Sequence, residues 1–298
     1  RVLKPRISQL ASSIDADVAT AYKSIYNSVG TPGTTPGTSL VLLQAQQKLN
    51  EFATPMSPRY ATVNPAANAG LVEGMKGLFN PTDTVSRQFK NGMMGTGVLG
   101  FDEINMSQSI GMHTTGAWGT TITSTGTLST QGQATLPISF TGSSKTWKQG
   151  DVFTIAGVYA VNPQTRQSTG SLQQFVVTAD VTATTTGTLA ISPPIYTADH
   201  ALATVDSFPQ ATAVVTMLGS ASTQYAQNLS YHKDAITLAT ADLLLPQGVD
   251  MASRQTHNGI SMRIVRQYDI NNDRMPCRVD VLYGYAAIRP SMATRIWG

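Results

Sequence analysis

The stretch GTGVLGFDEINMSQSIGMH, residues 95–113, contains three glycines in the spacing G-x-G-x-x-G. In a dinucleotide-binding turn this spacing follows a strand, opens a helix and precedes an acidic residue by about 20 positions. Here the preceding QFKNGMMG has the pattern of a helix end and a loop, and FDEINMSQSI alternates like a strand. Residues 114–120, TTGAWGT, contain no acidic residue. We therefore interpret Gly95, Gly97 and Gly100 as a structural turn that leads into a strand, and we expect no cofactor.

Other patterns of catalysis or metal binding are missing from the sequence. There is no H-E-x-x-H, P-loop, G-x-S-x-G or kinase motif. Four histidines stand singly, and each is expected to be a surface or a hydrogen-bonded structural residue: His113, His200, His232 and His257. Asp102 and Glu103 are neighbours on the expected strand, so their side chains would point to opposite faces. Cys277 lies in an apolar strand pattern, where a buried, unreactive thiol is expected. The sequence predicts that the protein is not an enzyme and holds no metal.

The amino-acid composition narrows the classes of protein that remain. The chain has 298 residues, 12% of them charged, against roughly 25% in an average globular protein. The net charge of +3 is too small to indicate nucleic-acid binding by itself, and weak self-repulsion suits a protein that packs against copies of itself. No apolar run is long enough for a membrane-spanning helix. Because the chain opens RVLKPRISQL, inside a helical pattern and without methionine, we expect further sequence before Arg1.

The first third of the chain has helical and α/β patterns. Apolar residues recur at three- and four-residue steps from Leu3 to Val29, which predicts a long helix over 4–29 that Gly30 terminates. The following patterns predict alternating helices and one strand: a helix over 40–53 capped by Ser39, a strand over 60–63, a helix from Asn64 and Pro65 through Phe79, and a short helix from Thr82 or Asp83 to Asn91.

The character changes near residue 114, where Thr, Ser and Gly dominate and short β-rich runs follow until about Gly219. Short strands separated by Gly, Pro and Asn predict a small antiparallel barrel or sandwich. Residues 224–244 have helical and mixed patterning, and the strands over 259–268 and 277–288 flank a turn. The sequence therefore predicts an α/β body interrupted by an inserted β-domain.

Basic residues gather at both ends. Arg1, Lys4 and Arg6 cluster near the start. Seven arginines concentrate toward the C-terminus: Arg254, Arg263, Arg266, Arg274, Arg278, Arg289 and Arg295. They could contact nucleic acid or acidic neighbours. Ion pairs within or between subunits are the favoured interpretation, because no aromatic residues are interleaved for base stacking.

The order of helix, Gly-rich turn and GFDEINMSQSI resembles the G-x-x-x-GFD-x-x-x-S segment of tailed-phage major capsid proteins. RYATVNPAANAGLVEGMKGLF (59–79) is similar to their strand that ends in Asn-Pro before a core helix. The ending VDVLYGYAAIRPSMATRIWG (279–298) resembles their last strand and tail, through Tyr283, Gly284, Arg289 and Pro290. KQGDVFTIAGVYAVNPQTRQSTGSLQQFVVTADV (148–181) is similar to the inserted β-domain of short-tailed-phage coat proteins of the gene-five class.

The resemblance has two departures. The N-terminal arm and extended loop that precede the family's long spine helix are absent from this sequence. The segment between Thr125 and Trp147 is shorter than in the family and lacks a charged loop that could reach a neighbouring subunit.

The resemblance implies an α+β Hong Kong 97-type capsid fold, with a long spine helix, axial and peripheral domains and an inserted antiparallel β-barrel-like domain. The implied divisions are a spine helix over 1–30, a first axial part over 31–118, an inserted β-domain over 119–222 and a second axial and peripheral part over 223–298.

The implied function is that of a major capsid protein, which self-assembles as pentamers and hexamers into the icosahedral head shell around double-stranded DNA. Implied partners are scaffolding and portal proteins and, by proximity, the packaged DNA; no membrane is expected. Arg1, Lys4 and Arg6 would lie on the inner surface or between subunits. The implied location is the virion capsid, after assembly in the host cytoplasm. The alternative is a β-rich virion-surface or secreted binding module, against which the helical flanks argue; an enzyme ranks third.

Overall fold

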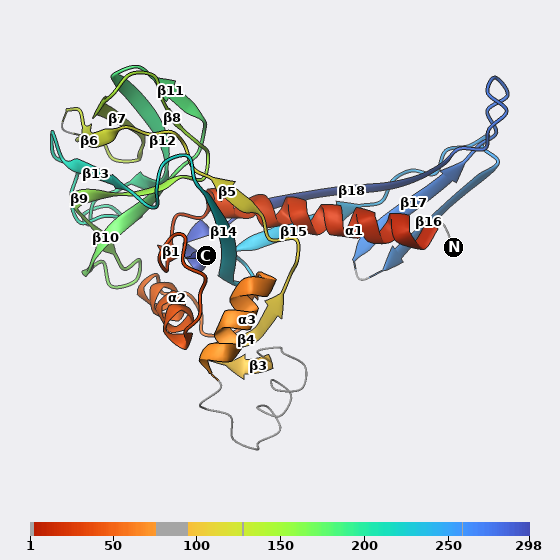
Figure 1. The fold of residues 1–298 in the computed structure, drawn as a ribbon, viewed down its shortest axis with the longest axis horizontal. Coiled ribbons are helices and arrows are strands. Elements are labelled where there is room, and N and C mark those ends of the chain that lie inside the picture. The colour runs from red at the N-terminus through yellow and green to blue at the C-terminus, as the bar shows by residue number, and fades with distance from the viewer. Residues whose placement is uncertain (1–2, 76–94, 127, 258) are drawn as a thin grey trace. The chain divides into compact units, whose positions relative to one another are not determined.

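The computed structural model describes residues 3–75, 95–126, 128–257 and 259–298. The chain divides into two compact units. Unit 1 combines Arg1–Val18 with Thr237–Ala286, and unit 2 combines Ala19–Ile236 with Ala287–Gly298. Helices and strands occur together in a mixed α+β architecture, which confirms the expected fold class (Figure 1).

Unit 2 contains a mixed core sheet in the order β1-β19-β14-β2-β4-β3, with β5 also paired to β14. Its strands are β1 Ser28–Val29, β2 Arg59–Val63, β3 Gly95–Val98, β4 Phe101–Met106, β5 Met112–Thr114, β14 Gln224–His232 and β19 Ala293–Trp297. β1 runs parallel to β19 and β2 parallel to β4, whereas the other pairs are antiparallel. The strand predicted over 60–63 is confirmed as β2.

Two helices, α2 (Ser39–Glu51) and α3 (Pro65–Gly74), pack on this sheet through buried apolar residues such as Leu49 and Leu71. The predicted Asn64 cap is confirmed, since its side-chain oxygen accepts a hydrogen bond from the backbone N–H of Ala67 at 2.8 Å. The predicted Ser39 cap is wrong. Thr38 is the capping position and Ser39 is already helical, because the extended backbone ends at Thr38, one residue earlier than expected.

The inserted β-domain is a closed six-stranded barrel, which confirms the predicted architecture. Around the barrel the order is β10-β12-β7-β6-β13-β9. Its strands are β6 Thr120–Ser124, β7 Gln133–Thr141, β9 Val152–Val161, β10 Ser168–Val177, β12 Thr186–Ile195 and β13 Val214–Met217. A short pair, β8 (Lys145–Trp147) and β11 (Val181–Ala183), accompanies it. Alternate residues point inward, as Leu136, Ile138 and Phe140 do on β7.

Unit 1 contains most of helix α1 (Leu3–Ala19) and a four-stranded sheet in the order β15-β18-β17-β16. The strands are β15 Ile236–Ala241, β16 Met251–His257, β17 Ile260–Arg266 and β18 Cys277–Ala287. β17 and β18 form the hairpin that the sequence predicted. The hydroxyl of Tyr283 on β18 donates to Asp17 of α1 at 2.8 Å, so the helix is tied to the sheet by a polar contact.

The predicted helix over 4–29 is too long. α1 ends at Ala19, a 3-10 turn η1 occupies Thr20–Ser24, and the chain then becomes strand β1. Ile25 and Tyr26 are adjacent and both buried, so this segment passes through the core instead of presenting a one-sided stripe. Gly30, with φ of 87°, therefore follows a strand and does not terminate a helix.

Two further expectations are corrected. The helical and mixed pattern over 224–244 is actually the strands β14 and β15. β14 lies between β19 and β2 with both faces covered, so its residues show no alternation. The strand predicted over 277–288 is not the last one, because β19 follows the short 3-10 turn η3 (Pro290–Met292). The helix from Thr82 or Asp83 to Asn91, and the stretch 76–79, lie outside the described residues.

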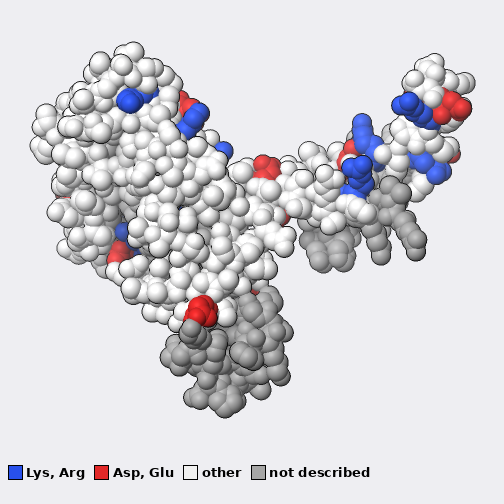
Figure 2. All heavy atoms as spheres, viewed as in Figure 1, with Lys and Arg blue, Asp and Glu red and all other residues white. Residues whose placement is uncertain are grey.

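Charged residues are sparse on the face of unit 2 that Figure 2 displays, whereas unit 1 carries groups of both signs. Four of the seven C-terminal arginines form ion pairs within the chain, as the sequence favoured: Arg254–Asp242, Arg263–Asp280, Arg266–Asp250 and Arg278–Asp280.

Cys277 is exposed, contrary to expectation, because it begins β18 at the turn end of the β17–β18 hairpin. In the described part of the chain, no helix is long and apolar enough to cross a membrane.

Candidate functional site: a buried polar junction beneath the barrel

The three glycines of the 95–100 spacing lie in a β-hairpin. Gly95 and Gly97 are on β3, and Gly100 follows Leu99 in the tight turn between Val98 and Phe101. Gly97 and Gly100 have φ of 68° and 77°, which favour glycine. A side chain at position 100 would also collide with Gln46 of α2. The hairpin joins two antiparallel strands, whereas a dinucleotide turn joins a strand to a helix.

The basic residues near the start of the chain are only partly described. Arg1 and the side chain of Lys4 lie outside the described residues. Arg6 is on α1, exposed, and donates to Gln9 Oε1 at 3.4 Å. It lines a shallow hollow of about 420 Å³ in unit 1 together with Cys277 and Arg278.

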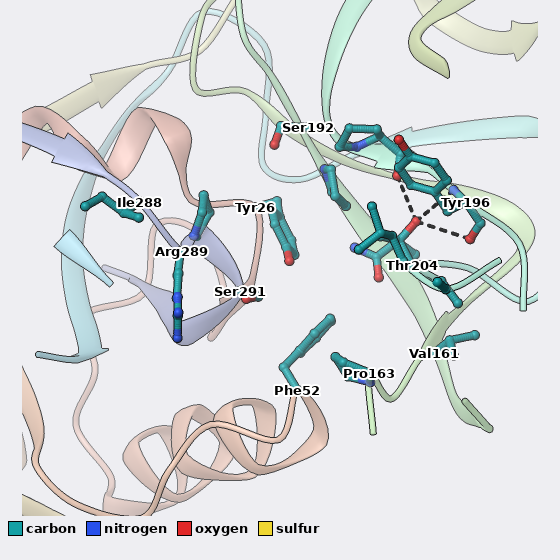
Figure 3. Close-up of a pocket in the computed structure, with 17 residues that line it drawn as sticks. Tyr26, Phe52, Val161, Pro163, Ser192, Tyr196, Thr204, Ile288, Arg289 and Ser291 are labelled. Carbon is teal, nitrogen blue, oxygen red and sulfur yellow. Dashed lines mark hydrogen bonds between the residues drawn. The ribbon is translucent and has the colours of Figure 1, made fainter. Parts of the chain in front are cut away.

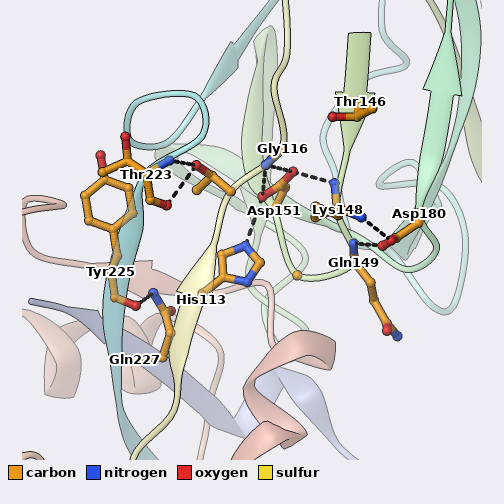
Figure 4. Close-up of polar contacts among 12 residues, drawn as sticks. His113, Gly116, Thr146, Lys148, Gln149, Asp151, Asp180, Thr223, Tyr225 and Gln227 are labelled. Carbon is orange, nitrogen blue, oxygen red and sulfur yellow. Dashed lines mark hydrogen bonds and ion pairs between the residues drawn. The ribbon is translucent and has the colours of Figure 1, made fainter.

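The barrel joins the core of unit 2 around Asp151, which is 1% exposed. Its carboxylate accepts hydrogen bonds from the backbone N–H of Lys148 at 2.7 Å and of Gly116 at 3.1 Å. It also contacts Nε2 of His113 at 2.9 Å (Figure 4). His113 and Gly116 belong to the segment that enters the barrel, and Lys148 begins the turn before β9. Asp151 therefore fastens the entry segment to the barrel's own turn.

Close backbone approach supports this attachment. A side chain at Gly116 would collide with the carbonyl oxygen of Thr146, so the entry segment can lie against β8 only because residue 116 is glycine. The backbone N–H of Ala117 donates to Thr146 Oγ1 at 3.0 Å. At the exposed end of the same turn, Lys148 and Asp180 form an ion pair of 2.8 Å.

From the core side, Arg295 of β19 reaches the same turn. Its side chain is fully buried, and its guanidinium donates to the carbonyl oxygen of Gly150 at 2.6 Å and to Gln227 Oε1 at 2.7 Å. The guanidinium also lies 4.8 Å from the ring centre of Trp297 and 5.1 Å from that of Tyr22. Burial lowers the pKa of Arg295 to about 10, so the side chain still carries its charge at neutral pH. Arg295 thus connects β19 and β14 to the barrel.

His113 completes the junction as a neutral ring. Donation of its Nε2 proton to Asp151 leaves Nδ1 to accept from the hydroxyl of Tyr22 at 3.3 Å. Burial lowers the pKa of His113 below its ordinary value of 6.5, and the nearby charges of Arg295 and Lys23 act in the same direction. The hydrogen bond to Asp151 opposes this shift without cancelling it.

The lowered pKa predicts acid sensitivity. The stability that neutral His113 contributes is present above pH 6.5 and is lost as the pH falls from there through the lower folded-state pKa. Between about pH 7.5 and about pH 5.5, wild type should therefore lose more unfolding free energy than His113→Gln, whose amide can donate and accept but does not titrate. Urea unfolding at both pH values measures this difference. Equal losses in the two proteins would contradict the prediction.

The sequence singles out His113 and Arg295 separately, but it does not predict that they meet at Asp151. Asp151 and Arg295 are separated by 144 positions, and neither belongs to a motif with a chemical role. The one available signal was the quoted KQGD stretch, in which Gly150 and Asp151 precede β9. His113 was expected to be a surface or hydrogen-bonded structural residue, and it is the latter.

Unit 2 also contains a cavity of about 600 Å³. Its core side includes Tyr26 and Phe52, and its barrel side includes Tyr196 and Thr204 (Figure 3). Its polar lining does not form an arrangement of nucleophile, base and acid. Across the described residues, no group of three or more His, Cys, Asp or Glu side chains could hold a metal ion.

Comparisons with known proteins agree with the resemblance seen in the sequence. The profile of the family described as "P22 coat protein - gene protein 5" matches residues 1–298. A major capsid protein of Acyrthosiphon pisum secondary endosymbiont phage 1 is 24% identical over 289 residues, covering 91% of this chain and 68% of the relative.

Two solved structures are also similar. A chain from Mycobacterium phage Che8 has a TM-score of 0.46 at 10% identity, and the comparison covers 99% of this chain but only 61% of that one. The CUS-3 coat protein I-domain has a TM-score of 0.26 at 31% identity, covering 34% of this chain and 96% of that domain. Because the family profile matches the whole chain, the protein belongs to the P22 coat protein family of phage coat proteins.

Proposed function

We propose that this chain is the repeating subunit of an icosahedral phage head, with the Hong Kong 97-type fold, that assembles through pentamers and hexamers around double-stranded DNA. The observation that carries this proposal is the family match over residues 1–298. In this role the chain acts by forming interfaces and catalyses no reaction.

The surface of unit 1 supports a role in assembly. Eight large apolar residues between positions 238 and 282 are exposed: Leu238, Leu244, Leu245, Met251, Tyr268, Ile270, Met275 and Leu282. Concentrated apolar exposure marks surfaces that become buried against other chains. Leu244 is 85% exposed, while Arg263 donates to its carbonyl oxygen at 2.5 Å and Arg254 donates to that of Leu243 at 3.3 Å. The two arginines thus hold the backbone of an apolar segment that faces solvent.

In this proposal residues 119–222 form the inserted domain and face outward, while 1–30, 31–118 and 223–298 build the shell wall. Arg1, Lys4 and Arg6 lie on the inner surface or between subunits, near packaged DNA. Scaffolding and portal proteins act during assembly in the host cytoplasm, and the product is the virion capsid. The junction of Asp151, His113 and Arg295 keeps the barrel in a fixed position on the core while subunits pack.

Expression of the full gene product that carries this chain, with any scaffolding gene encoded beside it, tests the proposal. Negative-stain electron microscopy should show closed shells of uniform diameter. A variant with leucines 244 and 245 both changed to aspartate should stay folded by circular dichroism yet give few shells, because it places charge on the apolar surface. Monodisperse monomers of wild type under all conditions would refute the proposal.

A further inference from the structure

The cavity between the barrel and the core of unit 2 has a buried floor and an exposed rim. Tyr26, Phe52 and Val161 on the floor are 5%, 7% and 1% exposed. At the rim, Leu202 from the barrel side and Ile288 from the core side are 64% and 62% exposed. Large aliphatic side chains exposed at the mouth of an apolar cavity indicate that another apolar group covers them.

The rim also carries a positive charge. Arg289 lines the cavity next to Ile288 and is exposed (Figure 3). Its side chain forms no ion pair with any residue in the described ranges. An occupant that places a carboxylate beside an apolar side chain would therefore satisfy both features of the rim.

The chain itself displays such a group at the turn between β17 and β18. Ile270 is 80% exposed, and it follows Asp269. The carboxylate of Asp269 accepts from the backbone N–H of Asn271 at 3.1 Å and from Asn272 Nδ2 at 2.8 Å, and these bonds lower its pKa. Asp269 is thus charged, and among the described residues no ion pair neutralises it. With Asp273 and Arg274, the turn carries a net charge of −1.

The turn is also held in shape before any contact. The backbone N–H of Asp269 donates to the carbonyl oxygen of Arg274 at 2.8 Å, and the hydroxyl of Tyr268 donates to Asp273 at 2.7 Å. A rigid turn loses little conformational entropy when it docks, which favours binding.

We propose that the 268–274 turn of one copy inserts Ile270 into the 600 Å³ cavity of a second copy, with Asp269 facing Arg289. The donor and acceptor surfaces differ, so the contact is head-to-tail and can close into rings. This inference rests on the proposed shell function and names one of the contacts within it.

Cysteine cross-linking between separate chains tests the contact. In a Cys277→Ser background, one chain carries Leu202→Cys and another carries Ile270→Cys. The two are mixed, assembled and oxidised. The contact predicts a disulfide-linked dimer in mixed shells and none in shells of either variant alone, because only the mixture brings the two positions together. Gln255→Cys, at an exposed position on β16 of unit 1, replaces Ile270→Cys as the control and should give no dimer.

Mixed shells that form without the dimer would overturn the contact while leaving the shell function intact. A variant that carries both cysteines in one chain gives a further check: if its disulfide forms only within a single chain and never between two chains, the contact is also overturned. Failure of wild type to form any shell would instead refute the proposed function.

Charge reversal gives a second test that does not depend on the cysteine background. Arg289→Asp and Asp269→Arg should each slow shell formation on the order of tenfold, because like charges then meet at the rim. The double variant should recover most of the wild-type rate. Glu103→Arg, at an exposed position on β4, serves as the control and should assemble normally. Absence of recovery in the double variant, with both single variants folded, would contradict the pairing.

Discussion

Replacement of Arg295 by alanine is expected to lower the free energy of unfolding of unit 2 by about 3–5 kcal/mol. The change removes one of the largest fully buried side chains and leaves a cavity. It also leaves the carbonyl oxygen of Gly150 and Oε1 of Gln227 buried without their charged donor. Each loss alone is costly, and here both fall on the connection between β19 and the barrel. Urea unfolding followed by circular dichroism measures the effect.

Two variants control this experiment. Lys148→Ala removes a half-exposed ion pair in the same turn and should leave the unfolding free energy nearly unchanged. Arg295→Lys keeps a charge but cannot reach both acceptors with one planar group, so it should recover only part of the loss. Full stability of Arg295→Ala would mean that the buried guanidinium does not hold the barrel to the core.

Replacement of Trp147 by alanine should cost the barrel about 3–5 kcal/mol. Trp147 is completely buried in the barrel's apolar cluster, and its ring lies edge-on to Phe140 with ring centres 4.8 Å apart. Alanine removes this contact and leaves a cavity that rigid strands cannot fill. The barrel of the variant should unfold at a lower urea concentration than that of wild type. Faster hydrogen exchange of the β7 and β9 amides measures this change.

Trp118 provides the matched comparison. It is only half-buried and packs against the same cluster, so Trp118→Ala should cost about 1–2 kcal/mol. Equal losses of unfolding free energy at the two positions would show that burial of the tryptophan in the barrel does not determine the size of the loss. Because the barrel and core share the junction of Asp151 and Arg295, Trp147→Ala should also reduce the number of shells formed.

Local patterns predicted the helices and strands whose conformation is determined by residues close together in the sequence. The alternation in FDEINMSQSI gave β4, and Asn64 with Pro65 gave the start of α3. Apolar and β-branched runs between turn residues gave the barrel strands. These predictions succeeded because a helix cap, a turn glycine and a one-face-buried strand are each determined within a few residues.

Predictions failed where a segment is buried on all sides, because its residues then show no alternation between a buried and an exposed face. β14 is covered on both faces, so its polar and apolar residues show no period, and the 224–232 stretch has a helical or mixed pattern. The same reason explains the end of α1, where Ile25 and Tyr26 are both buried and the stripe of spaced apolar residues continues past the real helix. Strand β19 was missed because five consecutive buried residues contain Thr294 and Arg295, which are polar.

The sequence by itself determined the α+β class, the inserted barrel, the β17–β18 hairpin and the family. It did so through the order of short motifs and through periodicities that extend over single elements. Only the tertiary structure decided that Arg295, His113 and Asp151 meet beneath the barrel and that Leu202 and Ile288 share one cavity. Those contacts join positions more than thirty residues apart. Buried polar groups need hydrogen-bond partners, and here the fold supplies those partners from distant parts of the chain. A local sequence pattern therefore does not reveal them.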